Sequence, residues 1–126
     1  MIKLLLACPL FLTSFLSTAL AQNQAKLDSL IKISNEYPKN DSLKMRMLIR
    51  VYGELVYNKR PLAELKKYAD SAKAIAVQLP NRDNIRKFYF RLGVVHHGKG
   101  EFAEALEIYK EGVALVSKEG DKDLEA

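Results

Sequence analysis

Cysteine and histidine are scarce in this 126-residue sequence, which has one cysteine and two histidines. The cysteine, Cys8, lies in the N-terminal segment, so residues 22–126 contain none and form no disulfide among themselves. Strict alternation of apolar and polar residues is also missing, which excludes an extensive β-sheet. Apolar residues make up 48% of the chain and charged residues 28%, which excludes disordered and collagen-like proteins. The length leaves room for one domain or a few repeats, stabilised by packing.

A strong charge of one sign is absent as well. The chain carries 20 basic and 15 acidic side chains, a formal charge of +5, which is too small to indicate a nucleic-acid partner. The charges are unevenly distributed, because residues 39–99 hold 14 basic and 5 acidic groups whereas residues 100–126 hold 3 and 8. Solvated helix faces account for this asymmetry, and head-to-tail association of oppositely charged ends is the alternative.

The first 21 residues have the order of a secretory signal peptide. A basic Lys3 is followed by an uncharged, largely apolar run over residues 4–20 and by an Ala-Leu-Ala ending, which predicts cleavage after Ala21. The mature protein would then be exported across the inner membrane and be periplasmic or extracytoplasmic. Two alternatives stay open. The first is an uncleaved membrane anchor, for which the apolar run is barely long enough. The second is a lipoprotein signal ending at Cys8, for which the apolar stretch before that cysteine is short.

Apolar residues spaced three and four apart through the rest of the chain predict an all-α fold. Five helices are expected, over residues 25–36, 42–57, 61–79, 84–97 and 101–119. Short connections make successive helices antiparallel. Residues with capping side chains mark the starts of two helices: Asp41 caps the second helix and Asp83 the fourth. Pro61 is expected at the first position of the third helix, and Gly120 is expected to end the fifth. Residues 120–126 are expected to begin a further helix.

The region from residue 89 to residue 109 carries a small-residue pattern typical of a packed helix pair. Leu92 is followed by Gly93, whose missing side chain allows a second helix to approach closely. Ala105 is the small residue expected to face that gap, and Tyr109 fills the seam one turn later. This pattern resembles a tetratricopeptide repeat.

The resemblance extends over the mature chain but weakens toward its start. His96 and Gly112 stand where the family usually has tyrosine and alanine, and no proline closes the unit. A shift of 41 residues aligns a degenerate earlier unit. The resemblance implies a right-handed α-solenoid of antiparallel helix hairpins with about two and a half repeats. Its parts would be an N-terminal capping helix (22–40), a degenerate hairpin (41–80) and a second hairpin (81–119).

In this family the first helices of the repeats line a concave groove that binds peptides or partner domains, so a protein or peptide partner is implied here. Tyr57 and Phe90 are the aromatic residues that we expect to act as interface anchors. The subfamily that clamps C-terminal carboxylates needs asparagine and lysine in the groove, and here Phe90 and Val94 replace them. The groove candidates are Arg46, Ile49, Gly53 and Tyr57 on the second helix and Lys87, Phe90, Val94 and His97 on the fourth.

Two further interpretations concern what lies outside this unit. The exported start and degenerate repeats also resemble the periplasmic N-terminal region of bacterial sensor histidine kinases and related regulators. In that alternative the chain would be a sensory region whose catalytic part lies beyond Ala126, and a downstream segment or an uncleaved signal would connect it to a membrane. Because few repeats leave the last helix partly uncovered, self-association through the C-terminal end is a further alternative.

No pattern in the sequence indicates catalysis, a cofactor or a metal. His96 and His97 are adjacent, so on a helix they point about 100° apart and cannot bind one ion together. The glycines follow no strand and match no phosphate-binding fingerprint. The glutamates of the fifth helix lie at helical spacings near its start, where the helix dipole favours negative charge: Glu101, Glu104, Glu107 and Glu111. We therefore expect a non-enzymatic interaction module.

Overall fold

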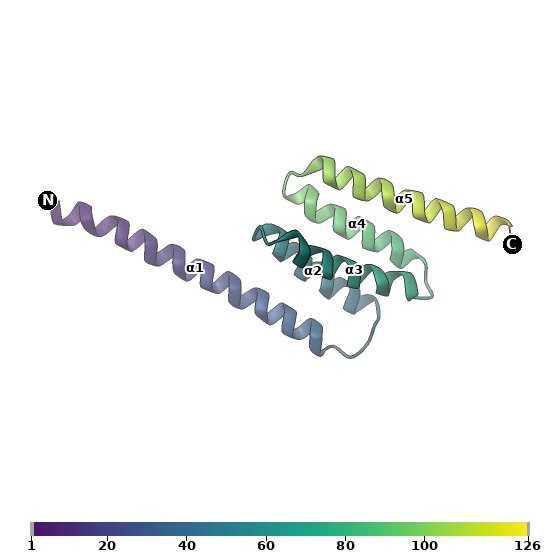
Figure 1. Ribbon diagram of the computed structural model, residues 1–126, viewed down its shortest axis with the longest axis horizontal. Coiled ribbons are helices and arrows are strands. Elements are labelled where there is room, and N and C mark those ends of the chain that lie inside the picture. Colours follow the sequence, from purple (N-terminus) through teal and green to yellow (C-terminus); the bar gives the residue numbers. More distant parts are fainter. Residues whose placement is uncertain (1, 126) are drawn as a thin grey trace.

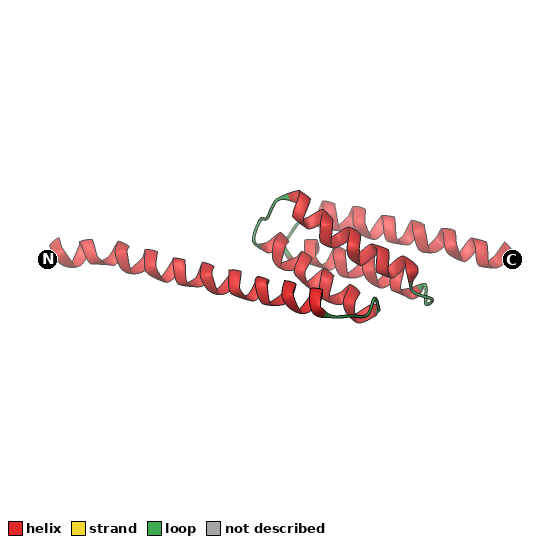
Figure 2. Cartoon of the chain, turned by 60° about the horizontal axis from the view of Figure 1, so that its bottom comes forward, coloured by secondary structure: helices red, strands yellow, loops and turns green. Residues whose placement is uncertain are grey.

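A computed structural model describes the backbone of residues 2–125 and the side chains of residues 16–118. Over that range the chain forms five α-helices and no strand, so the predicted all-α fold is confirmed. Helices α2 to α5 pack antiparallel in one bundle, and the first part of α1 projects beyond it (Figure 1). The connections lie at the two ends of the bundle (Figure 2). The helices are α1 (Ile2–Glu36), α2 (Ser42–Tyr57), α3 (Leu62–Gln78), α4 (Asp83–Gly98) and α5 (Phe102–Glu125).

Helix α2 begins at the cap that the sequence predicts. The carboxylate of Asp41 accepts hydrogen bonds from the backbone amides of Leu43 and Lys44, at 3.1 and 3.0 Å. The hydroxyl of Tyr37 donates to the same carboxylate at 2.7 Å, and this bond is the main reason why the pKa of Asp41 lies below its ordinary value. Lys44 Nζ donates to the carbonyl oxygens of Ser34 and Tyr37, so the end of α1 is tied to the start of α2.

The starts of α3 and α4 differ slightly from expectation. Pro61 is the residue before α3 rather than its first helical residue, and its ψ of 144° is extended. Asp83 is the first residue of α4 and not its cap, because its carboxylate pairs with Arg86 at 2.6 Å. The side chain of Asn81 takes the role expected of Asp83, since its Oδ1 accepts a hydrogen bond from the Asp83 amide at 3.0 Å.

The predicted end of the fifth helix at Gly120 is wrong, and so is a new helix over residues 120–126. Helix α5 runs through Gly120 to Glu125 without interruption. A glycine inside a helix costs only about 1 kcal/mol relative to alanine, so it does not by itself end a helix. Gly100 does reverse the chain, because it adopts the left-handed conformation with a φ of 84°.

Helix α1 is longer than the sequence suggests. It was expected to begin near Ala25, but it runs from Ile2 to Glu36 through the predicted cleavage site after Ala21. The side chains of residues 1–15 of the predicted signal peptide lie outside the described residues. Among the residues that can be judged, no helix is long and apolar enough to cross a membrane.

The core lies between α2, α3 and α4, and α1 adds a smaller cluster. The smaller cluster joins Leu27 of α1 to Val51 and Leu55 of α2, all of which are almost fully buried. Between them the two clusters fix α1, α3 and α4 around α2. The main cluster consists of Met45, Leu48, Ile49, Tyr52, Val56, Ala72, Ile75, Ala76, Ile85, Phe88, Tyr89 and Leu92.

Helices α4 and α5 are packed through two glycines that each face a tyrosine. A Cβ placed at Gly93 would lie 2.7 Å from Cζ of Tyr109, and one at Gly112 would lie 2.6 Å from Cβ of Tyr89. The close approach predicted at Gly93 is therefore present. The atoms nearest to Gly93 belong to the ring of Tyr109 and not to Ala105. Ala105 is itself buried, one turn before Tyr109 on α5.

Candidate functional site

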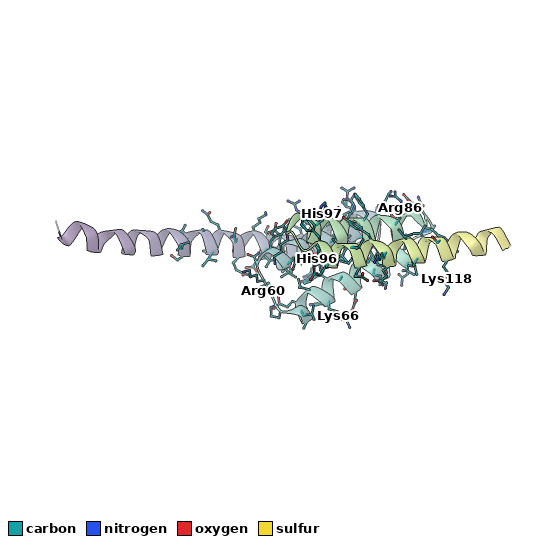
Figure 3. All side chains as sticks on the ribbon, turned by 90° about the horizontal axis from the view of Figure 1, so that it is seen from above. Arg60, Lys66, Arg86, His96, His97 and Lys118 are labelled. Carbon is teal, nitrogen blue, oxygen red and sulfur yellow. The ribbon has the colours of Figure 1, made fainter. Side chains whose placement is uncertain are left out.

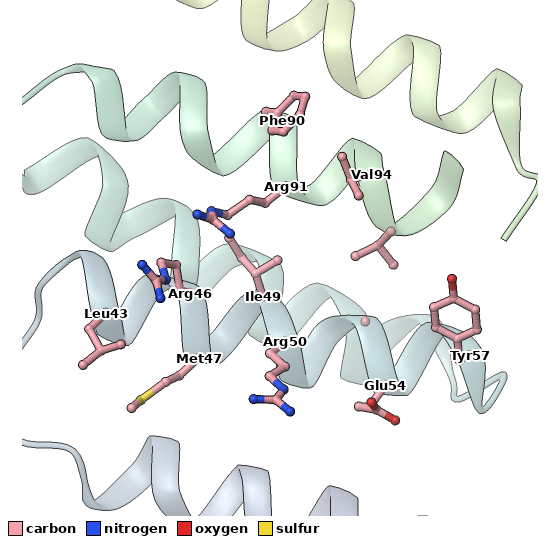
Figure 4. A pocket seen from close by; sticks show the side chains of 12 residues that line it. Leu43, Arg46, Met47, Ile49, Arg50, Glu54, Tyr57, Phe90, Arg91 and Val94 are labelled. Atoms are coloured by element: carbon pink, nitrogen blue, oxygen red, sulfur yellow. The ribbon is translucent and has the colours of Figure 1, made fainter. Parts of the chain in front are cut away.

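A cleft with a volume of about 610 Å³ lies between α2 and α4. The two helices are parallel because each packs antiparallel to α3, so both begin at the same end of the cleft (Figure 4). In that view Arg46 and Arg91 lie toward one end, and Glu54 and Tyr57 toward the other. The lining residues are Leu43, Arg46, Met47, Ile49, Arg50, Gly53, Glu54 and Tyr57 from α2 and Phe90, Arg91, Val94 and Val95 from α4.

The cleft contains six of the eight groove candidates, and two lie elsewhere. Lys87 is one turn before the cleft, where its Nζ lies 3.5 Å from a carboxylate oxygen of Asp83. His97 is at the end of α4, and its ring packs edge-on against Phe102 at a centroid distance of 5.2 Å. The six that line the cleft are Arg46, Ile49, Gly53, Tyr57, Phe90 and Val94.

Several lining residues were missed because the sequence does not say where α1 docks. Leu43 and Met47 are apolar residues that helical periodicity alone would place in the core, but they line the cleft at its edge nearest α1 (Figure 4). Arg50 and Arg91 carried a signal that could have identified them, because each lies four residues after a candidate on the same helix face. Glu54 and Val95 complete the set that sequence reasoning missed.

The bottom of the cleft is apolar and closely packed. Ile49 is only 4% exposed and belongs to the main core. At Gly53 the two helices come together, since a Cβ there would lie 3.4 Å from Cγ2 of Val95. Above this floor Phe90 and Val94 are 56% and 44% exposed, and each offers apolar area that a ligand could cover.

The charged residues of the cleft are three arginines and one glutamate. Glu54 is already neutralised, because its carboxylate lies 2.9 Å from Nζ of Lys26 on α1. Arg46, Arg50 and Arg91 are exposed and line the cleft with no described counter-ion. The cleft therefore presents an apolar floor beneath an excess of positive charge.

A chain of hydrogen bonds joins α2 to α4 near the far end of the cleft. Tyr52 Oη lies 2.6 Å from His96 Nε2, and His96 Nδ1 lies 3.1 Å from a carboxylate oxygen of Glu101. Beside it, Lys99 Nζ donates to the carbonyl oxygen of Val56 at 2.8 Å. These contacts tie the turn between α4 and α5 to the last turns of α2. The sequence did not indicate these partners of His96, because Tyr52 is 44 residues away.

This hydroxyl, imidazole and carboxylate arrangement has a structural explanation. Tyr52 is 7% exposed and packs within the main core, and burial raises the pKa of its hydroxyl, with Glu101 adding to the increase. A buried, protonated hydroxyl is a poor nucleophile.

His96 and His97 lie on different sides of α4 (Figure 3). Within the part of the chain whose side chains are described, no group of three or more metal-ligating residues comes together.

A comparison of the chain with protein-family models, curated proteins and solved structures finds no significant match. Function is therefore inferred from the cleft and its chemistry.

Proposed function

We propose that this chain is a non-catalytic interaction module of tetratricopeptide type, and that the α2–α4 cleft binds a peptide segment of a partner protein. The proposal includes a right-handed solenoid of about two and a half repeats, with α2 and α4 as the groove-lining helices. It is supported by the five antiparallel helices and by the close α4–α5 packing at Gly93 and Gly112.

The shape of the cleft is the main support for a peptide ligand. Arg46 and Tyr57 are eleven residues apart on α2, which places them about 16 Å apart along the helix axis. An extended peptide of about five residues covers that length. Small-molecule sites enclose most of their ligand, whereas this cleft presents Tyr57, Phe90 and Val94 with large exposed fractions. Exposed aromatic side chains are the groups that contribute most binding energy at protein interfaces.

The proposal is tested by selecting random dodecapeptides displayed on phage against the full chain. We expect enriched peptides whose affinity, measured by fluorescence polarisation, falls about tenfold in Val94→Gln, because the substitution places a polar amide against the apolar part of the bound peptide. Val77→Gln is the matched control, because Val77 is a similarly exposed valine on α3, outside the cleft. Equal affinity of both variants, or no enriched peptide, would contradict a peptide-binding cleft.

Export belongs to the same proposal and has its own test. Expression with a C-terminal tag in a Gram-negative host is expected to give periplasmic protein whose N-terminal residue is Gln22, because the cleavage signal precedes that residue. An intact N-terminus or retention in the cytoplasm would contradict export by a cleaved signal, and would leave the function of the cleft unaffected.

A further inference from the structure

Among the side chains that the structure describes, the arginines of the α2–α4 cleft differ from Arg60 and Arg86 in forming no ion pair. In the region with described side chains, Arg46, Arg50 and Arg91 make no ion pair and no side-chain hydrogen bond. By contrast, Arg60 and Arg86 each form an ion pair with a carboxylate three or four residues away, Glu64 and Asp83 respectively. Among the described side chains, Arg60 and Arg86 outside the cleft are thus paired with carboxylates, and the three arginines that line the cleft are not.

The positive charge of the cleft is reinforced by what surrounds it. Its single acidic lining residue, Glu54, is held by Lys26 at 2.9 Å and so is not available to the arginines. Arg46 and Arg50 are one helical turn apart, where like charges repel each other. A negatively charged ligand would relieve that repulsion, and guanidinium groups bind carboxylates through paired, directed hydrogen bonds.

We infer that the cleft binds an acidic peptide segment that also carries apolar side chains, an inference that rests on the proposed peptide-binding function. The arginines would hold the carboxylates of the peptide, while its apolar side chains would pack against Val94 above Ile49 and against the exposed ring of Phe90 at the rim of the cleft. This aliphatic floor favours a peptide over a polyphosphate or a single-stranded nucleic acid, which would use the arginines and leave the floor uncovered. Charge complementarity and apolar contact select the same ligand.

The experiment compares the sequences selected from random dodecapeptides by three forms of the full chain. These are the wild type, the charge-reversed double variant Arg46→Glu with Arg91→Glu, and the control Lys66→Glu. Lys66 is an exposed lysine of α3, away from the cleft (Figure 3), so the control tests the effect of overall charge. Arg46→Gln with Arg91→Gln is a milder second variant. Because both arginines are exposed and unpaired, we expect normal circular dichroism spectra from all forms.

We expect the wild type and Lys66→Glu to enrich acidic peptides that contain apolar residues. A synthetic peptide of the enriched sequence should bind the double variant about tenfold or more weakly, and raising the salt concentration from about 50 mM to about 500 mM should weaken wild-type binding about fivefold. Lys66→Glu should stay within about twofold of the wild type. Enriched basic or neutral peptides, or equal binding by the double variant, would overturn the acidic inference and leave the peptide-binding cleft in place.

Three other results would also overturn it. A fluorescent oligothymidylate that binds more tightly than the peptides, and is released by the double variant, would assign the cleft to nucleic acid. If the wild-type chain dimerises in sedimentation and the double variant is monomeric, the cleft would be occupied by a second copy of this chain instead of a peptide. Failure to enrich any peptide would overturn the proposed function and this inference together.

Discussion

The packing of α4 against α5 predicts that alanine is destabilising at Gly112, although alanine favours helices. A Cβ at Gly112 would lie 2.6 Å from Cβ and 2.9 Å from Cγ of Tyr89. Carbon atoms in contact prefer about 3.5–4.0 Å, so the helices must separate by about 1 Å. Tyr89 is 4% exposed, and its Cβ is fixed to the α4 backbone, so no rotation of the side chain relieves the overlap.

The expected magnitude follows from two opposing effects. Replacing glycine by alanine in a helix interior stabilises by about 1 kcal/mol, and overpacking a filled interface destabilises by about 1–3 kcal/mol. Because the overlap is with an atom that cannot move, we expect the second effect to prevail by about 1–2 kcal/mol. In a domain of this size the midpoint of thermal unfolding would then fall by about 5 °C or more.

Two other glycines provide graded controls. At Gly93 the close atoms belong to the ring of Tyr109, which is only half-buried and can rotate outward, so Gly93→Ala should cost less than Gly112→Ala. Removing that ring with Tyr109→Ala should make Gly93→Ala stabilising. At Gly53 the nearest atom, of Val95, lies at an ordinary 3.4 Å, so Gly53→Ala should be neutral or stabilising.

The assay is urea unfolding followed by far-ultraviolet circular dichroism, with thermal unfolding as a check. The expected order of stability places Gly53→Ala at or above the wild type, then Gly93→Ala, then Gly112→Ala. A Gly112→Ala protein as stable as the wild type would refute the reasoning, because it would mean that α4 and α5 do not meet in this register.

Two further predictions concern the core. Burial raises the pKa of Tyr52, so the folded state favours its protonated form. The resulting contribution to stability should be present below about pH 10 and be lost as the pH rises through the pKa that Tyr52 has in the folded protein. Tyr52→Phe should reduce that alkaline decline in the unfolding midpoint, and an unchanged slope would show that Tyr52 does not contribute to it. Leu27→Ala should cost about 2–4 kcal/mol, because Leu27 is 3% exposed between Val51 and Leu55. A Leu27→Ala protein with wild-type stability in urea would mean that α1 does not dock on α2.

The helices were largely predictable from the sequence because their boundaries depend on local chemistry. Asp41 caps α2 through bonds to amides two and three residues away, a pattern readable from neighbouring letters. Errors arose where a tertiary or competing local contact decides the outcome. Asp83 pairs with Arg86 instead of capping, and α5 continues through Gly120, whereas Gly100 adopts the left-handed conformation that reverses the chain.

The cleft was predictable only in part. Helical periodicity placed Phe90 and Val94 on the correct face of α4, and the resemblance to a known repeat selected α2 as the opposite wall. Arg50 and Arg91 could have been found from the helical spacing, whereas the pairing of Glu54 with Lys26 depends on the position of α1, which neither periodicity nor composition specifies. The same limit applies to the Tyr52–His96 contact, since two residues 44 positions apart meet only after three helices have packed.

The contacts that join α2 to α4 are concentrated at one end of these helices. Tyr52 with His96, and Lys99 with the carbonyl of Val56, lie near the C-terminal ends. Among the side chains that are described, no hydrogen bond or ion pair connects the N-terminal halves of α2 and α4. Polar contacts thus hold the two helices together toward their C-terminal ends, whereas their N-terminal halves are joined by the buried apolar cluster that contains Met45, Ile85 and Phe88.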